Sequence, residues 1–356
     1  MEESFRVRAP GRICLFGEHS DYLGLDVIAA SINMAIEILC TPREDRDVNI
    51  VYTDLKENDS FSLDSEIQYR NKRDYVRSAF NVMIRKGNIP VNGVDLKISG
   101  NIPIAAGLSS SSALTVGAVM VVSQLSEAKM NPEEIALTAY EAEVEEFGES
   151  GGNMDHFASA VGGVIHVDMK DNSVSKLPAK LDSIVIGDSE EKKQDTVGDL
   201  RYIRTTVERE YELITQKISS FDRRSTPVNR VYELGKSKPT KERSMAEATL
   251  RNRDLTSRAL RLLDNEKPNH QELGEMLKEH HEILRDDLDR STPKIERMIE
   301  AAYSAGATGC KINGSGGGGT MMAYAVGKVS EVVSAIEKAG GTAYIVNVGK
   351  GAKLKP

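Results

Sequence analysis

The segment Gly107-Leu108-Ser109-Ser110-Ser111-Ser112 runs directly into an apolar stretch, Leu114 to Leu125, that predicts a helix. Small residues let a backbone approach a ligand closely. The first turn of a helix offers unpaired N–H groups and the positive end of the helix dipole, and nearby hydroxyls add donors or metal ligands. The segment therefore predicts an anion site. A serine-rich helix cap without a ligand is an equally good interpretation of this stretch alone.

A second glycine-rich loop, Gly314-Ser315-Gly316-Gly317-Gly318-Gly319, follows strand-like residues Cys310 to Asn313. Four consecutive glycines cost backbone entropy on folding, so such a loop indicates close packing or ligand approach. A flexible linker is the alternative, but the apolar residues on both sides argue against it. Neither loop is a Walker A motif, because Gly-Lys-Ser/Thr is absent from both.

A third feature is the polar cluster within Gly11 to Tyr22, which contains Arg12, Glu18, His19 and Asp21. Carboxylates and an imidazole on one loop are suitable partners for several hydroxyls of a polyol. A zinc site is disfavoured, because only one histidine is local and the His-Glu-x-x-His spacing is absent. A solvated acidic turn is the alternative.

Two further carboxylates are candidates for chemistry. Asp155 lies in the turn Gly151-Gly152-Asn153-Met154-Asp155-His156, where it could accept a proton from a hydroxyl nucleophile. Glu143, twelve residues earlier on a predicted helix, could ligate Mg²⁺. Each signal is weak alone, since an aspartate after a Gly-Gly turn is often a helix cap.

The overall composition excludes several function classes. The chain has 356 residues and a net charge of −8, which disfavours generic binding to nucleic acid or anionic membranes. Its three cysteines are far apart and odd in number, so a disulfide framework is not expected. There is no apolar run of the roughly 20 residues that a membrane helix needs, and no secretory signal pattern. A cytoplasmic location is the default expectation.

The order of predicted elements indicates a two-domain α+β protein, with an N-terminal domain over residues 1–180 and a C-terminal domain over 181–356. Residues 188–245 are highly charged and are interpreted as solvated helix faces and loops. Strands are predicted at Phe5 to Arg8, Ile13 to Phe16, Asn33 to Thr41, Gly93 to Ser99, Gly162 to Asp168 and Ala343 to Val348, and a strand–turn–strand at Cys310 to Ala325. Helices are predicted at Asp74 to Lys86, Pro132 to Phe147, Met245 to Leu263, His270 to Leu288, Pro293 to Ala305 and Val329 to Ala339.

These motifs, in this order, resemble those of the GHMP kinase superfamily, the group of galactokinase, homoserine kinase, mevalonate kinase and phosphomevalonate kinase. Residues 11–22 look like the galactokinase-type first motif, with Glu-His-x-Asp-Tyr intact. Residues 107–113 look like the phosphate loop, and 311–319 like the glycine-rich third motif. The resemblance implies an N-terminal domain like the second domain of ribosomal protein S5, a ferredoxin-like C-terminal domain, and an active site between them.

The resemblance also implies roles for individual residues. The backbone of Gly107 to Ser112, with Gly316 and Gly317, would hold ATP, and Ser110 and Glu143 would ligate Mg²⁺. Arg12 and Asp155 would flank the attacking hydroxyl. Glu18, His19, Asp21 and Tyr22 would bind a small-molecule sugar, phosphorylated at its anomeric hydroxyl. The oligomeric state is left open.

The chain departs from the galactokinase pattern at three places. Ala105-Ala106 precede Gly107, His156 follows Asp155 where glutamine is usual, and Leu23-Gly24-Leu25 replaces Asn-Gly-Gly. These differences argue against naming galactose as the sugar. The sugar branch is favoured over a mevalonate-type kinase, whose members usually carry an apolar stretch after Glu-His. A non-catalytic sugar sensor is the rival from another class, but it would be expected to lose Asp155, Arg12 or the phosphate loop.

Overall fold

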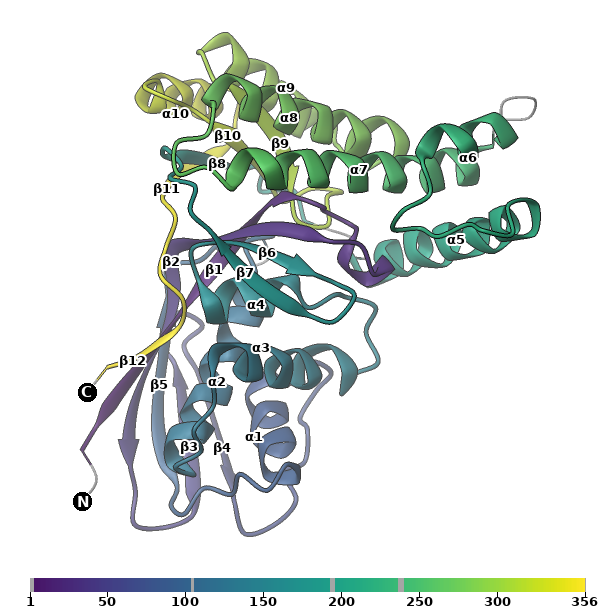
Figure 1. Ribbon diagram of the computed structural model, residues 1–356. Helices are drawn as coiled ribbons and strands as arrows, with labels where there is room; N and C mark the ends of the chain where they lie inside the picture. Colours follow the sequence, from purple (N-terminus) through teal and green to yellow (C-terminus); the bar gives the residue numbers. More distant parts are fainter. Residues whose placement is uncertain (1–2, 104–105, 193–195, 236–239, 356) are drawn as a thin grey trace.

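The computed structural model describes residues 3–103, 106–192, 196–235 and 240–355 (Figure 1). The chain forms two separate β-sheets, each packed against helices, which confirms the predicted α+β class. Among the described residues, no helix combines the length and the apolar character that a membrane span requires.

The first sheet has eight strands, ordered β12-β1-β2-β5-β3-β4, with β6 pairing β2 and β7 pairing β6. Its strands are β1 (Phe5–Phe16), β2 (Val27–Pro42), β3 (Asp47–Tyr52), β4 (Glu57–Ser62), β5 (Val94–Gly100), β6 (Val164–Asp168), β7 (Ser173–Leu177) and β12 (Lys353–Lys355). The prediction of two separate strands, Phe5 to Arg8 and Ile13 to Phe16, was wrong. A register shift between Pro10 and Arg12 accommodates the proline, so β1 continues through it.

Helices from the N-terminal half pack on this sheet or on one another, and one of them begins at a candidate site residue, Ser110. They are α1 (Tyr75–Arg85), α2 (Ser110–Leu125), α3 (Pro132–Tyr140) and α4 (Met154–Val161). Asn131 lies directly before Pro132, the first residue of α3, and caps this helix through a complete capping box with Glu134. The predicted helix Pro132 to Phe147 continues past α3 as a π-helical turn, η2 (Glu141–Glu145), which carries Glu143.

The second sheet has four antiparallel strands in the order β11-β8-β10-β9. They are β8 (Ile184–Asp188), β9 (Gly309–Asn313), β10 (Thr320–Tyr324) and β11 (Thr342–Val346). Helices α9 (Pro293–Ser304) and α10 (Val329–Lys338) contact this sheet and share a core with it. The glycine-rich loop connects β9 to β10, as the sequence predicts.

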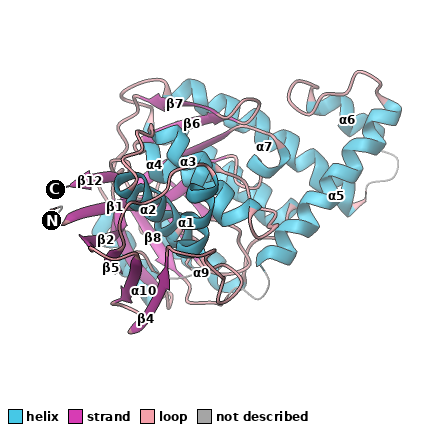
Figure 2. Cartoon of the chain, turned by 90° about the horizontal axis from the view of Figure 1, so that it is seen from below, coloured by secondary structure: helices cyan, strands magenta, loops and turns pink. Residues whose placement is uncertain are grey.

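The charged region after β8 forms two helices that extend away from both sheets (Figures 1 and 2). They are α5 (Thr196–Lys217) and α6 (Val228–Gly235), and both pack against α7 (Lys241–Leu263). We call residues 196–235 the helical arm. Next come α8 (His270–Glu282) and a π-helical turn, η3 (Ile283–Asp287). His280 and His281, on α8, are both buried.

The segment after β11 returns to the first sheet rather than staying with the second. The Gly349 N–H donates to the Ser31 carbonyl at 2.8 Å, and β12 pairs with β1. A side chain at Gly351 would lie 2.4 Å from the Ala160 carbonyl, so only glycine fits this crossing. Strands from the two halves of the chain therefore lie side by side in one sheet.

Candidate active site

Arg12 and Asp155 meet at the start of α4. Arg12 Nε and Nη2 donate to the two Asp155 oxygens at 2.6 and 2.8 Å, and the Ser109 hydroxyl donates to the second oxygen at 2.5 Å. Burial disfavours the charged carboxylate, but the charge of Arg12 and these hydrogen bonds outweigh it. The pKa of Asp155 is therefore held below its ordinary value. Asp155 is ionised at neutral pH, and Arg12 and Ser109 fix its orientation.

The phosphate loop is anchored by its backbone. The Gly107 carbonyl accepts hydrogen bonds from Arg12 Nη1 at 2.7 Å and from Asn313 Nδ2 at 2.8 Å. Ser109, which precedes α2, has a φ of 59°, a left-handed conformation that non-glycine residues seldom adopt. Strain of this kind persists only where surrounding contacts hold it. The first turn of α2 is thus presented to the same space as Asp155.

Glu18 joins the first motif to the second sheet. Its Oε2 accepts from Lys311 Nζ at 3.1 Å and from the Gly314 N–H at 2.9 Å, while Lys311 also donates to the Cys14 carbonyl at 2.9 Å. Lys311 is completely buried. Burial opposes ionisation of Glu18, but Lys311 and Arg12 outweigh it and lower its pKa. Glu18 thus links the predicted substrate motif to the glycine-rich loop.

Asp21 and its neighbours form a tight turn, η1 (Asp21–Leu23). The His19 Nδ1 and the Tyr22 hydroxyl are 2.7 Å apart, and Asp21 Oδ1 accepts from the Tyr22 N–H at 2.9 Å. Burial and repulsion from Asp155 raise the pKa of Asp21 to about 6. Among the described residues Asp21 forms no ion pair, so its carboxylate keeps acceptor capacity toward the cavity.

These residues surround one cavity of about 810 Å³. Its walls include most of the predicted site residues, namely Arg12, Glu18, His19, Asp21, Tyr22, Gly107, Ser109, Ser110, Ser111, Ser112, Glu143 and Asp155. The structure therefore brings together motifs that lie up to about 140 residues apart in the chain. Gly314, Ser315 and Gly319 add the third motif to the wall.

Three predicted ATP-binding residues lie away from the cavity wall. The Leu108 side chain is buried, and its carbonyl accepts from the Arg12 N–H at 3.1 Å. The Gly317 N–H donates to the Arg290 carbonyl at 2.8 Å, and a side chain at Gly316 would lie 2.5 Å from that carbonyl. Their assignment to ATP stays a prediction, because the structure shows them packing against the chain itself.

Comparisons with known proteins agree with this geometry. Residues 74–163 match the N-terminal domain of GHMP kinases, residues 259–342 match their C-terminal domain, and residues 1–42 match a galactokinase galactose-binding signature. A mevalonate kinase from Pyrococcus abyssi is 31% identical, over 96% of this chain and 95% of the relative. The chain belongs to the GHMP kinase family. It is therefore a member of a family of ATP-dependent kinases.

The relatives come from two branches of the family. A galactokinase from Haemophilus influenzae is 29% identical over 90% of this kinase and 84% of the relative. The crystal structure of Lactococcus lactis galactokinase complexed with galactose has a TM-score of 0.88, at 23% identity, covering 99% of this kinase and 95% of that chain. The two-domain GHMP kinase fold and the galactokinase-like first motif are both confirmed.

Several residues that shape the site of this kinase lie in or near predicted motifs, but their individual contacts were not predicted. Lys311 on β9 binds Glu18, and Asn313 on the same strand binds the Gly107 carbonyl. These contacts join the two sheets, and they depend on the position of β9 in the folded chain. Gly152 packs so closely on Asp21 that a side chain there would lie 2.1 Å from Oδ2. The glycine pair at 151–152 was visible in the sequence, but its partner was not.

The three departures from the galactokinase pattern also have positions in the structure. His156 Nε2 lies 2.8 Å from Glu143 Oε2, so the replacement of glutamine creates a buried pair. Leu23 and Leu25 are buried, which explains apolar residues after the first motif. Ala105 lies outside the described residues.

Proposed function

We propose that this kinase transfers the γ-phosphate of ATP to a hydroxyl, the anomeric one, of a neutral monosaccharide. The observation that carries the proposal is the carboxylate of Asp21, which faces the cavity without a cationic partner among the described residues. A carboxylate accepts hydrogen bonds from substrate hydroxyls, whereas it repels a substrate carboxylate. Glu18 and His19 line the same cavity.

The basic groups of the cavity wall support a neutral substrate over mevalonate, which is a carboxylic acid. Arg12 is committed to Asp155, and Arg73 pairs with Glu149 at 2.6 Å. Lys192, the other basic residue of the described wall, is solvent-exposed. A buried substrate carboxylate needs a cation or several donors. The mevalonate kinase relatives nevertheless make mevalonate the second candidate.

The residues on the wall fit the expected reaction. The first turn of α2 supplies N–H groups and hydroxyls for phosphate oxygens. Phosphoryl transfer depends mainly on positioning and charge stabilisation. Asp155 accepts or orients the proton of the attacking hydroxyl, and Arg12, while it stays paired with Asp155, adds positive charge near the transferring group.

Ser110 and Glu143 fit a magnesium site, because both offer oxygen ligands to the same cavity. Among the described residues no group of three or more acidic, cysteine or histidine side chains can hold a metal. A site with two protein ligands suits Mg²⁺, which usually binds one or two carboxylates and fills its other coordination positions with substrate phosphates and water. Bound there, Mg²⁺ would neutralise phosphate charge.

The test is ADP release with Mg-ATP against galactose, glucose, arabinose, mannose, glucuronate, galacturonate, N-acetylhexosamines, heptoses and mevalonate. Turnover of a neutral sugar, with a C1-phosphate seen by ³¹P NMR, is the expected result. Turnover of mevalonate alone would overturn the sugar proposal. ATP binding without turnover of any compound would favour the sensor alternative.

A further inference from the structure

Residues 18–25, which include η1 and Asp21, are called the substrate turn. The helical arm contacts this turn through two adjacent arginines. Arg223 and Arg224 lie in the connection between α5 and α6, nearly 200 residues after η1 in the chain. Arg223 Nη1 donates to the Leu23 carbonyl at 3.0 Å, and Arg224 Nη1 donates to the Gly24 carbonyl at 2.9 Å. The arm therefore holds the backbone directly after Asp21 and Tyr22.

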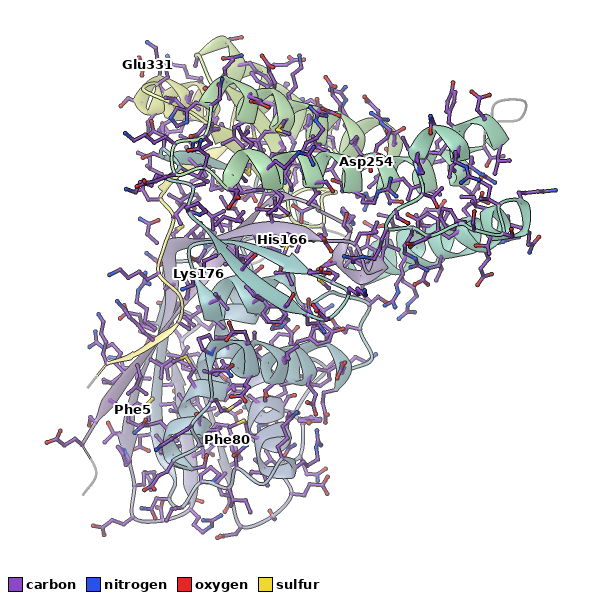
Figure 3. The ribbon with its side chains drawn as sticks, in the orientation of Figure 1. Phe5, Phe80, His166, Lys176, Asp254 and Glu331 are labelled. Carbon is purple, nitrogen blue, oxygen red and sulfur yellow. The ribbon has the colours of Figure 1, made fainter. Side chains whose placement is uncertain are left out.

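Arg224 also joins two carboxylates. Its Nη2 lies 2.7 Å from Asp26 Oδ1 and 2.7 Å from Asp168 Oδ1, at the end of β6. His166, labelled in Figure 3, lies on the same strand, and its Nε2 is 3.4 Å from Asp26 Oδ2. The Arg224 side chain is 28% exposed, so these pairs are partly shielded from water. One guanidinium thus ties the arm, the turn and the first sheet together.

Other contacts keep the two arginines in place. The Arg223 guanidinium lies 5.1 Å from the centre of the Tyr211 ring on α5. The backbone carbonyl of Arg223 accepts a hydrogen bond from Arg253 Nη1 at 2.8 Å. From α7, Asn252 Nδ2 donates to the Glu18 carbonyl at 2.8 Å and to the Ser20 hydroxyl at 3.1 Å. Hydrogen bonds therefore hold the substrate turn on both sides, from α7 before Asp21 and from the arm after Tyr22.

The turn is also supported by its side chains, because Tyr22, Leu23 and Leu25 are buried in the core. Its own hydrogen bonds, Gly24 N–H to Asp21 carbonyl at 2.9 Å and Leu25 N–H to Ser20 carbonyl at 3.1 Å, close it internally but do not fix its direction. Gly24 has a φ of 70°, a conformation that allows its carbonyl to point at Arg224. Burial holds these side chains, while the arm holds the Leu23 and Gly24 carbonyls, so the backbone path directly after Asp21 depends on both.

We propose that Arg224 is a positioning residue for the sugar, which acts by fixing the turn that carries Asp21 and so couples the helical arm to substrate affinity. The arm also lines the cavity directly through Val197 and Leu200. The proposal rests on the proposed function of this cavity. Lysine can replace the planar fork of Arg224 only in part, because one ammonium keeps the positive charge beside the carboxylates but cannot also meet the Gly24 carbonyl in that geometry.

The test compares Arg224→Gln and Arg224→Lys with the control Arg230→Gln. Arg230 lies on α6 of the same arm, is exposed, and forms no side-chain hydrogen bond or ion pair within the described residues. Hydrogen exchange of the full chain without substrate is measured first, because it needs no knowledge of the sugar. Amides of residues 22–26 are expected to exchange about tenfold faster in Arg224→Gln, on the magnitude of a lost charged hydrogen bond.

Kinetics then separate positioning from general damage. With the sugar that the panel identifies, Arg224→Gln should raise the sugar KM about tenfold or more, leave the ATP KM near normal, and be partly rescued by Arg224→Lys. Faster exchange confined to residues 22–26 supports the role of Arg224 even if no sugar is turned over. Missing turnover would count against the proposed function alone. Unchanged exchange there, or equal rises in both KM values, would overturn it.

Discussion

On the phosphate-loop side of the cavity, the Asp155 carboxylate accepts three hydrogen bonds from Arg12 and Ser109, whereas on the turn side Asp21 accepts one, from the Tyr22 N–H. The first carboxylate has a lowered pKa and the second a raised one, although both line one cavity. Asp155, the proposed reacting group, is thus fixed by contacts within the chain. Asp21, the proposed sugar-binding group, keeps free acceptor capacity, and the hydroxyls of a polyol would satisfy it.

The largest effect is expected from Asp155→Asn on the phosphate-loop side. The amide keeps the shape but cannot take a proton, so kcat should fall roughly 10²-fold or more while ATP binding is retained. Steady-state kinetics and calorimetry with a non-hydrolysable ATP analogue measure the two quantities. A near-normal kcat would show that Asp155 is not the base.

A smaller, separate effect is expected from Gly152→Ala on the turn side. The added methyl would lie 2.1 Å from Asp21 Oδ2 and must displace that carboxylate. The sugar KM should therefore rise by about tenfold or more, with less change in the ATP KM. Gly151→Ala is the matched control, because a methyl there meets only Val144, at 3.7 Å, an ordinary contact. Equal effects from both substitutions would show that Asp21 does not set sugar affinity.

The pH dependence should distinguish the two carboxylates. Asp21 is ionised above about 6 and protonated below, so kcat/KM for the sugar should fall as pH drops below about 6, by roughly tenfold per unit. Asp155, whose pKa is lowered, stays ionised across this range. In Asp21→Asn the inflection near 6 should disappear. An inflection that survives this substitution must come from another group.

The smallest effect is expected at Ser109, which supplies one of the three hydrogen bonds to Asp155. Ser109→Ala removes that bond and should lower kcat by about tenfold at most, since a hydrogen bond to a charged group contributes on the order of 1.5 kcal/mol. Ser109→Gly also removes it but relaxes the left-handed φ of 59°. The glycine variant should therefore be equally slow but more heat-stable than the alanine variant, as differential scanning calorimetry would show.

Much of the phosphate-loop side could be predicted from the sequence, because its groups lie within compact motifs. Gly107 to Ser112 lead into a strongly apolar helix, and the family resemblance predicts that Arg12 and Asp155 flank the same hydroxyl. The pairing of Asp155 with Ser109 was not foreseen, since it depends on the left-handed Ser109 backbone.

The turn side was predicted less completely, for a physical reason. The residues that position Asp21 come from distant segments, and their own local patterns are ordinary. Arg224 lies in a charged region that reads as a solvated surface, and Lys311 lies in a short apolar strand where burial of a lysine has no local signal. The strand β4 is largely polar and was not predicted, because it lacks an alternating apolar pattern.

The return of residues 349–355 to the first sheet has a consequence for how the chain matures on the ribosome. Strand β1 is made first, yet β12, which covers its open edge, is made more than 330 residues later. At about 5–20 residues per second, β1 keeps an unpaired edge for tens of seconds during synthesis. An unpaired edge is a template for pairing with other chains. The nascent kinase should therefore depend on chaperones until this segment has emerged and β12 has paired with the open edge of β1.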